Sequence, residues 1–209
     1  MRKSSFERSG KVKATVFGAG CLGFLMLFLF LFLASGGESM AQDAGTGESR
    51  VLELSSDEAY PGGKLAGDLV FDRLVLEKKS RLLTAYHGKD PVRVYLVALG
   101  FNPIGHKEQQ CDGRTPEGEY RIDGKNPNSA YYKNLGVSYP NAKDREQAGR
   151  LGKPPGGVIK IHGLGTSFPE IGPAHRLSDW THGCIALTNP EMEELYSHTP
   201  VGIKILILP

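Results

Sequence analysis

The chain has 209 residues, with 25 Lys and Arg, 23 Asp and Glu, and a formal net charge of +2 at pH 7. Five basic residues lie before position 14, and removal of the first 41 residues would leave 20 basic and 21 acidic residues. The exported part is therefore almost neutral, and nothing in its charge indicates the basic face that nucleic-acid binding requires. We expect no nucleic-acid partner.

The first element in chain order is the apolar run at residues 16–34, which carries no charge and follows a basic head. The order is typical of a secretory signal, while the length approaches that of a membrane-spanning helix. Cleavage after Ala41 would remove it, and retention would leave an inner-membrane anchor. Both outcomes export the rest to the periplasm or cell envelope, because basic residues stay on the cytoplasmic side. We therefore assign residues 1–34 to a signal peptide or N-terminal membrane anchor, the one membrane contact that we expect.

Residues 35–67 are rich in Gly, Ser and acidic residues, which is typical of a flexible polar linker. Residues 68–209 suffice for one domain with its own core. Apolar stretches separated by the polar turns EKKS and HGKDP predict a β-meander at residues 69–100. Further strands are predicted over 118–122, 158–162, 184–187 and 203–208.

Two short helices are predicted. One begins at Asn189, a residue that can cap a helix, with Pro190 at the first helical position and acidic residues in the first turn. The other is expected over residues 142–152. The predicted fold class is therefore mainly β with one or two short helices.

The residues with reactive side chains gather near the sequence THGC, residues 181–184. Strand alternation places His162 away from Ile161, and Cys184 away from Ile185, on the less apolar face of each strand. A neighbouring imidazole lowers the pKa of a thiol and favours the nucleophilic thiolate. His162 is the better partner because it comes from a separate strand.

Other interpretations stay open on the residues alone. In an exported chain Cys184 could form a disulfide with Cys111. A zinc hydrolase could use His162, His182 and Cys184, with His175 nearby, as an open catalytic site. A non-catalytic cell-wall-binding module is a third alternative.

Two motifs together resemble the L,D-transpeptidase catalytic domain (YkuD) family: His162 followed by Thr181-His182-Gly183-Cys184, and the block CDGRTPEGEYRI at residues 111–122. The resemblance covers roughly residues 68–209 and implies an L,D-transpeptidase-like β-sandwich. It implies that Cys184 is the nucleophile and that His162, oriented by the Gly163 carbonyl, accepts and returns the proton. His182 and Gly183 would shape the oxyanion site, where backbone amides stabilise the developing charge. No cofactor and no metal are implied.

The implied substrates are peptidoglycan stem peptides. A thioester forms on Cys184, D-alanine leaves, and the acyl group passes to an acceptor amine on a second stem peptide, a lipoprotein or an amino acid. With water as acceptor, the same site acts as an L,D-carboxypeptidase or amidase.

Relatives often carry Arg where this chain has Ala186, so Lys160 or Arg176 is expected to supply the missing charge. Thr181 and Trp180 complete the expected substrate-binding residues, with a packing role as the alternative for Trp180. The insert at residues 164–180 is expected to form a lid or wall of the site.

Overall fold

The computed structural model describes residues 63–166 and 169–209. The expected signal or anchor and most of the expected linker lie outside the described residues. In the described part of the chain, no helix is long and apolar enough to cross a membrane. The boundaries at residues 34 and 67 stay predictions.

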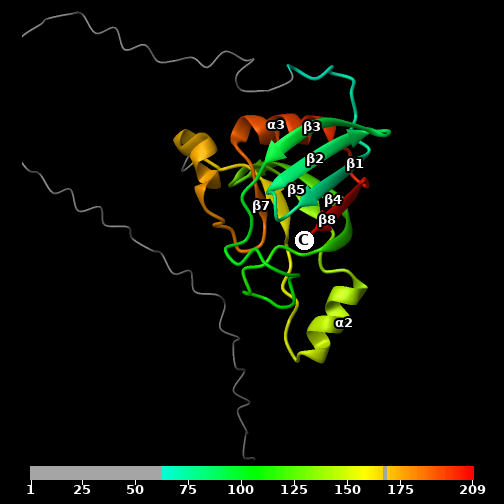
Figure 1. Ribbon diagram of the computed structural model, residues 1–209, viewed down its shortest axis with the longest axis vertical. Helices are drawn as coiled ribbons and strands as arrows, with labels where there is room; N and C mark the ends of the chain where they lie inside the picture. The colour runs from blue at the N-terminus through cyan, green and yellow to red at the C-terminus, as the bar shows by residue number, and fades with distance from the viewer. Residues whose placement is uncertain (1–62, 167–168) are drawn as a thin grey trace, which may run out of the picture. The chain divides into compact units, whose positions relative to one another are not determined.

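Eight strands form a curled sheet in the order β3-β2-β1-β8-β4-β5-β6-β7 (Figure 1). Their bounds are β1 Arg73–Glu77, β2 Leu82–His87, β3 Asp90–Leu96, β4 Gly118–Ser129, β5 Tyr132–Val137, β6 Lys160–His162, β7 Ile185–Ala186 and β8 Lys204–Leu208. The pairs β1–β8 and β6–β7 are parallel, whereas the others are antiparallel.

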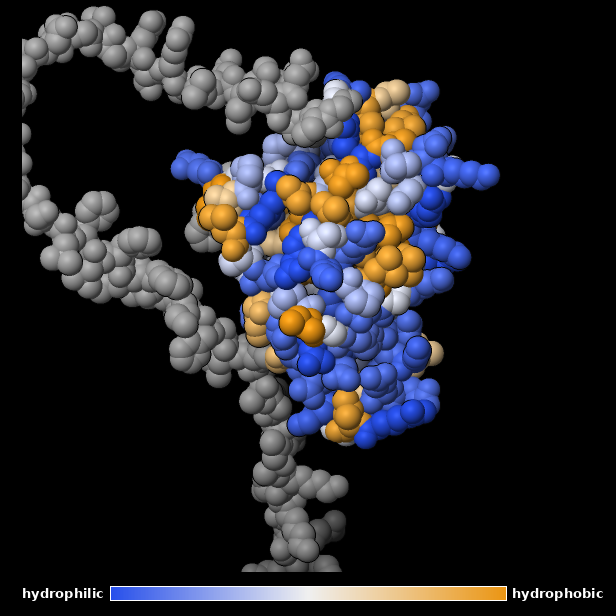
Figure 2. All heavy atoms as spheres, viewed as in Figure 1, coloured by the Kyte–Doolittle hydropathy of each residue, from blue (hydrophilic) through white to orange (hydrophobic). Residues whose placement is uncertain are grey.

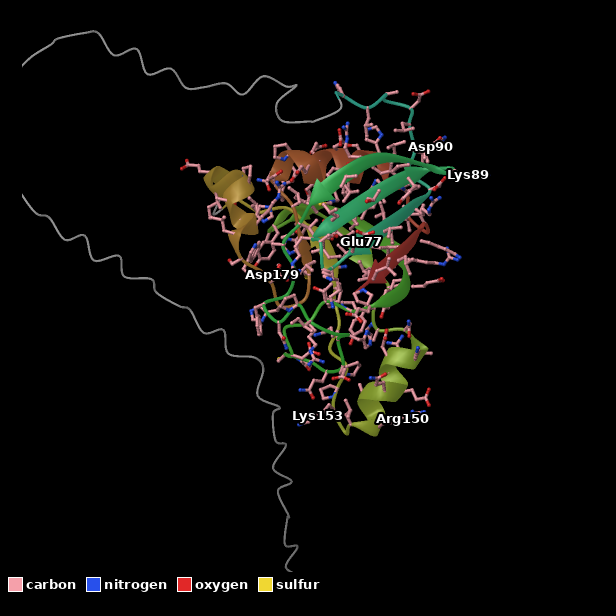
Figure 3. The ribbon with its side chains drawn as sticks, in the orientation of Figure 1. Glu77, Lys89, Asp90, Arg150, Lys153 and Asp179 are labelled. Carbon is pink, nitrogen blue, oxygen red and sulfur yellow. The ribbon has the colours of Figure 1, made fainter. Side chains whose placement is uncertain are left out.

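The predicted β-meander is confirmed as strands β1, β2 and β3. The EKKS stretch forms the first turn, where the Ser80 hydroxyl donates to the Glu77 carbonyl oxygen at 3.3 Å. The second turn passes through Gly88, whose φ of 62° suits a residue without a Cβ. Figure 3 shows its neighbours Lys89 and Asp90 together at one end of the meander.

Strand β4 is longer than predicted and joins the two halves of the sheet. Residues 118–121 pair with β8, and from Ile122 onward β4 pairs with β5. The prediction ended at residue 122 because Asp123, Gly124 and Pro127 usually occur in turns. The structure accommodates these residues with two shifts in the register between β4 and β5.

Strands β6 and β7 are shorter than predicted, and both differences arise from the backbone. Val158 has φ of 59°, outside the β region, so β6 begins only at Lys160. Gly183 has φ of 127°, so residue 184 belongs to a turn and β7 begins at Ile185. Strand β8 lies within its predicted range.

Three short helices are present in the described residues: α2 Ala142–Arg150, the 3-10 helix η1 Pro169–Leu177 and α3 Asn189–His198. Both predicted helices are confirmed. The cap of α3 differs, because Thr188 is the N-cap and forms a capping box with Glu191. Asn189 is instead the first helical residue, and its side chain bonds to a loop of the site. The expected lid or wall at residues 164–180 contains η1.

The core lies against the sheet and is covered partly by α3. Alternate strand residues are fully buried, including Leu74 and Leu76 of β1, and Met192 and Leu195 of α3 pack with them. A buried ion pair, Arg93 to Glu194 at 2.8 Å, also joins β3 to α3. The mainly β fold class is confirmed, with the strands in one curled sheet.

Candidate active site

Cys184 lies at the end of a turn that leads from Thr181 into β7. The Thr181 hydroxyl donates to the Cys184 carbonyl oxygen at 2.7 Å and accepts from the Gly183 amide at 3.1 Å. Thr181 is buried, and its backbone bonds to Leu99 and Phe101. Its hydroxyl therefore shapes the turn that carries Cys184, although the sequence suggested a substrate contact.

The expected oxyanion residues occupy different positions around this turn. The Gly183 amide is engaged by Thr181, so the Cys184 amide is the remaining candidate donor from the predicted pair. His182 is exposed and meets the edge of the Phe101 ring at a centroid distance of 5.5 Å. The structure thus places His182 at the rim of the turn.

The second sequence motif packs directly behind the turn. A Cβ on Gly183 would lie 2.5 Å from the Arg114 carbonyl oxygen, and a Cβ on Gly100 would lie 2.1 Å from the Gly113 carbonyl oxygen. The Gly100 amide donates to the Thr115 hydroxyl oxygen at 3.1 Å. The motif at residues 111–122 therefore supports the backbone around Cys184.

His162 ends β6 and is buried, with 5% of its surface exposed. Its Nδ1 lies 2.7 Å from the Gly163 carbonyl oxygen. Because a carbonyl oxygen only accepts hydrogen bonds, Nδ1 carries the proton and Nε2 carries the lone pair. This tautomer leaves Nε2 able to accept a proton, and the Gly163 carbonyl lies where the sequence predicted it.

Asn189 holds the loop that carries the Gly163 carbonyl. Its side-chain oxygen accepts from the Leu164 amide at 2.8 Å, and its side-chain nitrogen donates to the Gly165 carbonyl oxygen at 3.3 Å. A Cβ on Gly163 would lie 2.5 Å from the Asn189 oxygen. The sequence analysis missed this role because Asn189 also fits the cap of a helix.

The parallel pairing of β6 and β7 sets the positions of the two reactive residues. Ile161 lies opposite Ile185, and His162 lies opposite Ala186. Cys184 therefore lies one residue before the paired region, next to Lys160, and two positions along the strand from His162. Its Sγ is 3.8 Å from the Val158 carbonyl oxygen.

The alternation predicted for the segment after Cys184 is only partly correct. Ile185 and Leu187 are buried as expected, but Ala186 is also fully buried. Strand β7 has a neighbour on each side, because Ala98 bridges Ala186 opposite His162. The position where relatives often carry Arg is therefore buried and does not lie on an open face.

Burial dominates the electrostatics of the reactive pair. Burial raises the pKa of the Cys184 thiol, while a hydrogen bond from the Lys160 amide and the charges of Lys160 and Lys107 oppose that change. Burial lowers the pKa of His162, opposed by the hydrogen bond to Gly163. The resting state at neutral pH is therefore a neutral thiol with a neutral imidazole.

Two aromatic side chains flank the His162 ring. Tyr131 lies at a centroid distance of 4.8 Å and Trp180 at 5.9 Å. Trp180 is 36% exposed, so one part of its ring packs on His162 while another faces solvent. Tyr131 was missed, because a lone tyrosine between Ala130 and Tyr132 carries no recognisable signal in the sequence.

The two candidate cations differ in their availability. The Arg176 guanidinium forms an ion pair with Glu191, and this pair joins η1 to α3. Lys160 lies on β6 beside Cys184 and is partly buried. Lys160 is thus the better placed of the two to supply positive charge at the thiol.

The structure also bears on two alternatives. Cys184 is a free thiol, so it forms no disulfide with Cys111. Within residues 63–166 and 169–209, no group of three His, Cys, Asp or Glu residues is arranged to hold a metal ion. His162, His182 and Cys184 all lie in these ranges and do not form such a group.

Comparison with known families matches residues 72–207 to the L,D-transpeptidase catalytic domain, YkuD. The chain belongs to this family. Its members act on peptidoglycan stem peptides in the cell envelope. The predicted membership is confirmed.

Two relatives show how far the similarity extends. YafK of Escherichia coli (strain K12), provisionally named an L,D-transpeptidase, is 33% identical over 104 residues, which are 49% of this chain and 35% of YafK. The crystal structure of Pgp2, a helical cell shape determining protein from Campylobacter jejuni, is 26% identical with a TM-score of 0.51. That match covers 67% of this chain and 48% of Pgp2. The chain thus spans about a third of the first relative and about half of the second.

Proposed function

We propose that this chain is a cysteine acyltransferase, an L,D-transpeptidase that acts on peptidoglycan stem peptides. The observation that carries the proposal is the 2.7 Å contact between His162 Nδ1 and the Gly163 carbonyl oxygen, from which we infer that Nδ1 holds the proton and Nε2 is free to act as a base. A neutral base on the strand next to a free thiol is the arrangement that nucleophilic catalysis requires. Membership of the YkuD family supports the same reaction.

The first half-reaction begins from the neutral pair. His162 Nε2 takes the proton of the Cys184 thiol as the sulfur attacks the diaminopimelate carbonyl of the amide that joins diaminopimelate to D-alanine. The developing oxyanion is stabilised by the Cys184 amide. The imidazolium then gives its proton to the departing amine as the carbon–nitrogen bond breaks, so D-alanine leaves and a thioester stays on Cys184.

The second half-reaction reverses the proton transfers. An acceptor amine attacks the thioester, His162 takes the proton that this amine loses, and Cys184 leaves and regains a proton. An amine on another stem peptide or on a lipoprotein gives a new amide. If water attacks instead, the product is a shortened stem peptide and the activity is that of an L,D-carboxypeptidase.

Lys160 is proposed as the charge that favours the reacting sulfur. Its amide bonds to the sulfur and its ammonium group lowers the thiol pKa against the effect of burial. Lys160 therefore takes the part that the Arg of related chains would supply. Arg176 is proposed to hold η1 in place through its ion pair with Glu191. It would then affect substrate binding without contacting the substrate.

The proposal extends to the place of action. We propose that the N-terminal segment exports the domain, as a cleaved signal or as an anchor, to the periplasm where peptidoglycan lies. The relative Pgp2 is described as a helical cell shape determining protein. A corresponding change of cell shape on deletion of this chain is expected for an enzyme that modifies stem peptides.

One experiment tests the reaction. The purified full-length chain is incubated with disaccharide tetrapeptide, with and without an acceptor amine, and the products are identified by mass. Release of D-alanine with a covalent adduct on Cys184 supports the proposal, and dimers or tripeptide then separate transfer from hydrolysis. Retention of full turnover by Cys184→Ala, or loss with a chelator but not with a thiol alkylator, would refute it.

A further inference from the structure

A pocket of about 420 Å³ is lined by the two aromatic residues that flank His162. Its lining comes from the β4–β5 turn, the loop after β6, and the segment around η1: Tyr131, Leu164, Ile171, Ala174, His175, Ser178 and Trp180. The lining is mainly apolar, and Figure 2 shows apolar side chains gathered around η1. Ile171 and Leu177 of this segment are exposed, at 44% and 89%.

The pocket is separated from His162 by two aromatic side chains. Tyr131 and Trp180, which line it, are the two rings that pack against the His162 imidazole. In the proposed reaction His162 exchanges a proton with the leaving amine and with the acceptor amine, so both amines lie within hydrogen-bond reach of it. A group attached to either amine therefore lies near Tyr131 and Trp180, which line this pocket.

His175 is a polar residue of the pocket lining. The side chain is buried, with 6% exposed, and neither ring nitrogen has a hydrogen-bond partner. Burial, together with the nearby charge of Arg176, lowers the pKa of His175 to about 4, so the ring is neutral at pH 7. A neutral imidazole offers one donor and one acceptor, and burying both without partners is costly unless a ligand supplies them.

The charge of the pocket limits its occupant. The cation beside His175, Arg176, is paired with Glu191 and is not among the lining residues. A carboxylate or ammonium group would lose its hydration here without gaining an opposite charge, which is unfavourable. The disaccharide of a muropeptide is also a poor fit, because three residues of about 3.3 Å each separate it from the scissile amide.

We propose that this pocket binds an uncharged side chain on the amine partner of the reaction, and that His175 hydrogen-bonds the polar end of that side chain. This inference rests on the proposed acyl transfer, in which the amine lies beside His162. The pocket volume far exceeds the volume of the methyl group of D-alanine. This difference points to an acceptor with a larger neutral side chain. His175 is then a specificity-determining residue for the acceptor.

Trp180 allows a direct measurement of binding, because it is the only tryptophan of the chain and lines the pocket. The full-length Cys184→Ala protein is titrated with D-glutamine, D-glutamate and D-methionine while tryptophan fluorescence is recorded. These probes have similar size and differ in charge and in hydrogen bonding. We expect saturable changes with D-glutamine and D-methionine, and at least tenfold weaker binding of D-glutamate.

Variants of His175 separate recognition from structural support. In Cys184→Ala, a further His175→Leu change should weaken the binding of D-glutamine about tenfold, because D-glutamine loses a hydrogen bond. The binding of D-methionine should change little. His175→Gln should restore part of the D-glutamine affinity. The melting temperature of His175→Leu should equal or exceed that of the parent, because an unpaired buried polar group is removed.

The outcomes distinguish this inference from the proposed function. Release of D-alanine by the wild-type chain together with no saturable fluorescence change would refute the proposed binding in the pocket. The proposed acyl transfer would still be supported. Equal binding of D-glutamate and D-glutamine, or an equal loss of both neutral probes in His175→Leu, would also refute it. Selective binding without D-alanine release would support the pocket and contradict the acyl transfer.

Discussion

At the scale of single residues, the reactive pair starts from neutral forms. The sequence suggested that a neighbouring imidazole would lower the pKa of the thiol, but burial raises the pKa of Cys184 and lowers that of His162. Both shifts disfavour a resting thiolate–imidazolium pair. In the proposed reaction, proton transfer to His162 is then part of the attack on the substrate.

The alkylation of Cys184 by iodoacetamide should therefore follow the raised thiol pKa. The rate of alkylation should still rise as the pH increases above the ordinary pKa of a thiol, because a thiol with a raised pKa loses its proton at higher pH. Lys160→Gln should slow alkylation roughly threefold at pH 8, since it removes a charge that favours the thiolate.

Lys89→Gln provides the matched control for net charge. Lys89 is exposed in the β2–β3 turn, and Figure 3 shows it well apart from Asp179, which precedes Trp180 in the chain. This variant should react at the wild-type rate. Equal slowing in both variants would contradict a local effect of Lys160.

At the scale of elements, the site depends on a turn that no strand pattern describes. Gly183 combines a φ of 127° with close contact to the Arg114 backbone, so two segments about 70 residues apart in sequence meet there. This contact explains why the block at residues 111–122 accompanies the cysteine motif. It also makes the position intolerant of any side chain.

Gly183→Ala should lower the free energy of unfolding by about 2 kcal/mol and reduce D-alanine release strongly. The added Cβ meets backbone at 2.5 Å and is held in a strained backbone conformation. Urea unfolding and turnover of tetrapeptide would measure the two effects.

Gly149→Ala is the matched substitution in α2. A Cβ at Gly149 meets nothing within 4 Å, and the residue lies inside a helix, so this variant should gain about 0.5–1 kcal/mol. Turnover should stay at the wild-type level. A gain of stability in both variants would show that the contact behind Cys184 is looser than described.

At the scale of the whole molecule, one buried cation connects the sheet to the loop behind the site. Lys78 follows β1 and is 2% exposed. Its ammonium group donates to the Gly105 and Thr115 carbonyl oxygens at 2.6 and 3.0 Å and to Glu117 at 2.8 Å. The meander therefore supports the Cys184 turn through the loop that contains Thr115.

Lys78→Met should cost about 3 kcal/mol of unfolding free energy, because Glu117 and two carbonyl groups lose their buried partner. Turnover should fall as well, since the loop behind Gly183 loses its anchor. Thermal and urea unfolding measure the loss. Lys79→Met, one residue along and exposed, should change stability by no more than about 0.5 kcal/mol.

The sequence predicted most of the fold, because the meander, both helices and the mainly β class follow from local patterns. The catalytic roles of Cys184 and His162 stay predictions, and the Gly163 carbonyl oxygen lies 2.7 Å from His162 Nδ1. The sequence was less reliable where glycine or a positive φ interrupts a pattern, as at Val158 and Gly183. The alternation of apolar and polar residues along a strand does not predict where the backbone changes direction.

What the sequence by itself determined is the reactive residue types and their likeness to one family, since motifs depend on residue identity and spacing. Only the tertiary structure decided which groups surround them. The burial that sets both pKa directions, the Asn189 bonds to the His162 loop and the unpaired ring of His175 all arise from contacts between distant segments. Such contacts depend on how the sheet curls, and no local pattern in the chain encodes them.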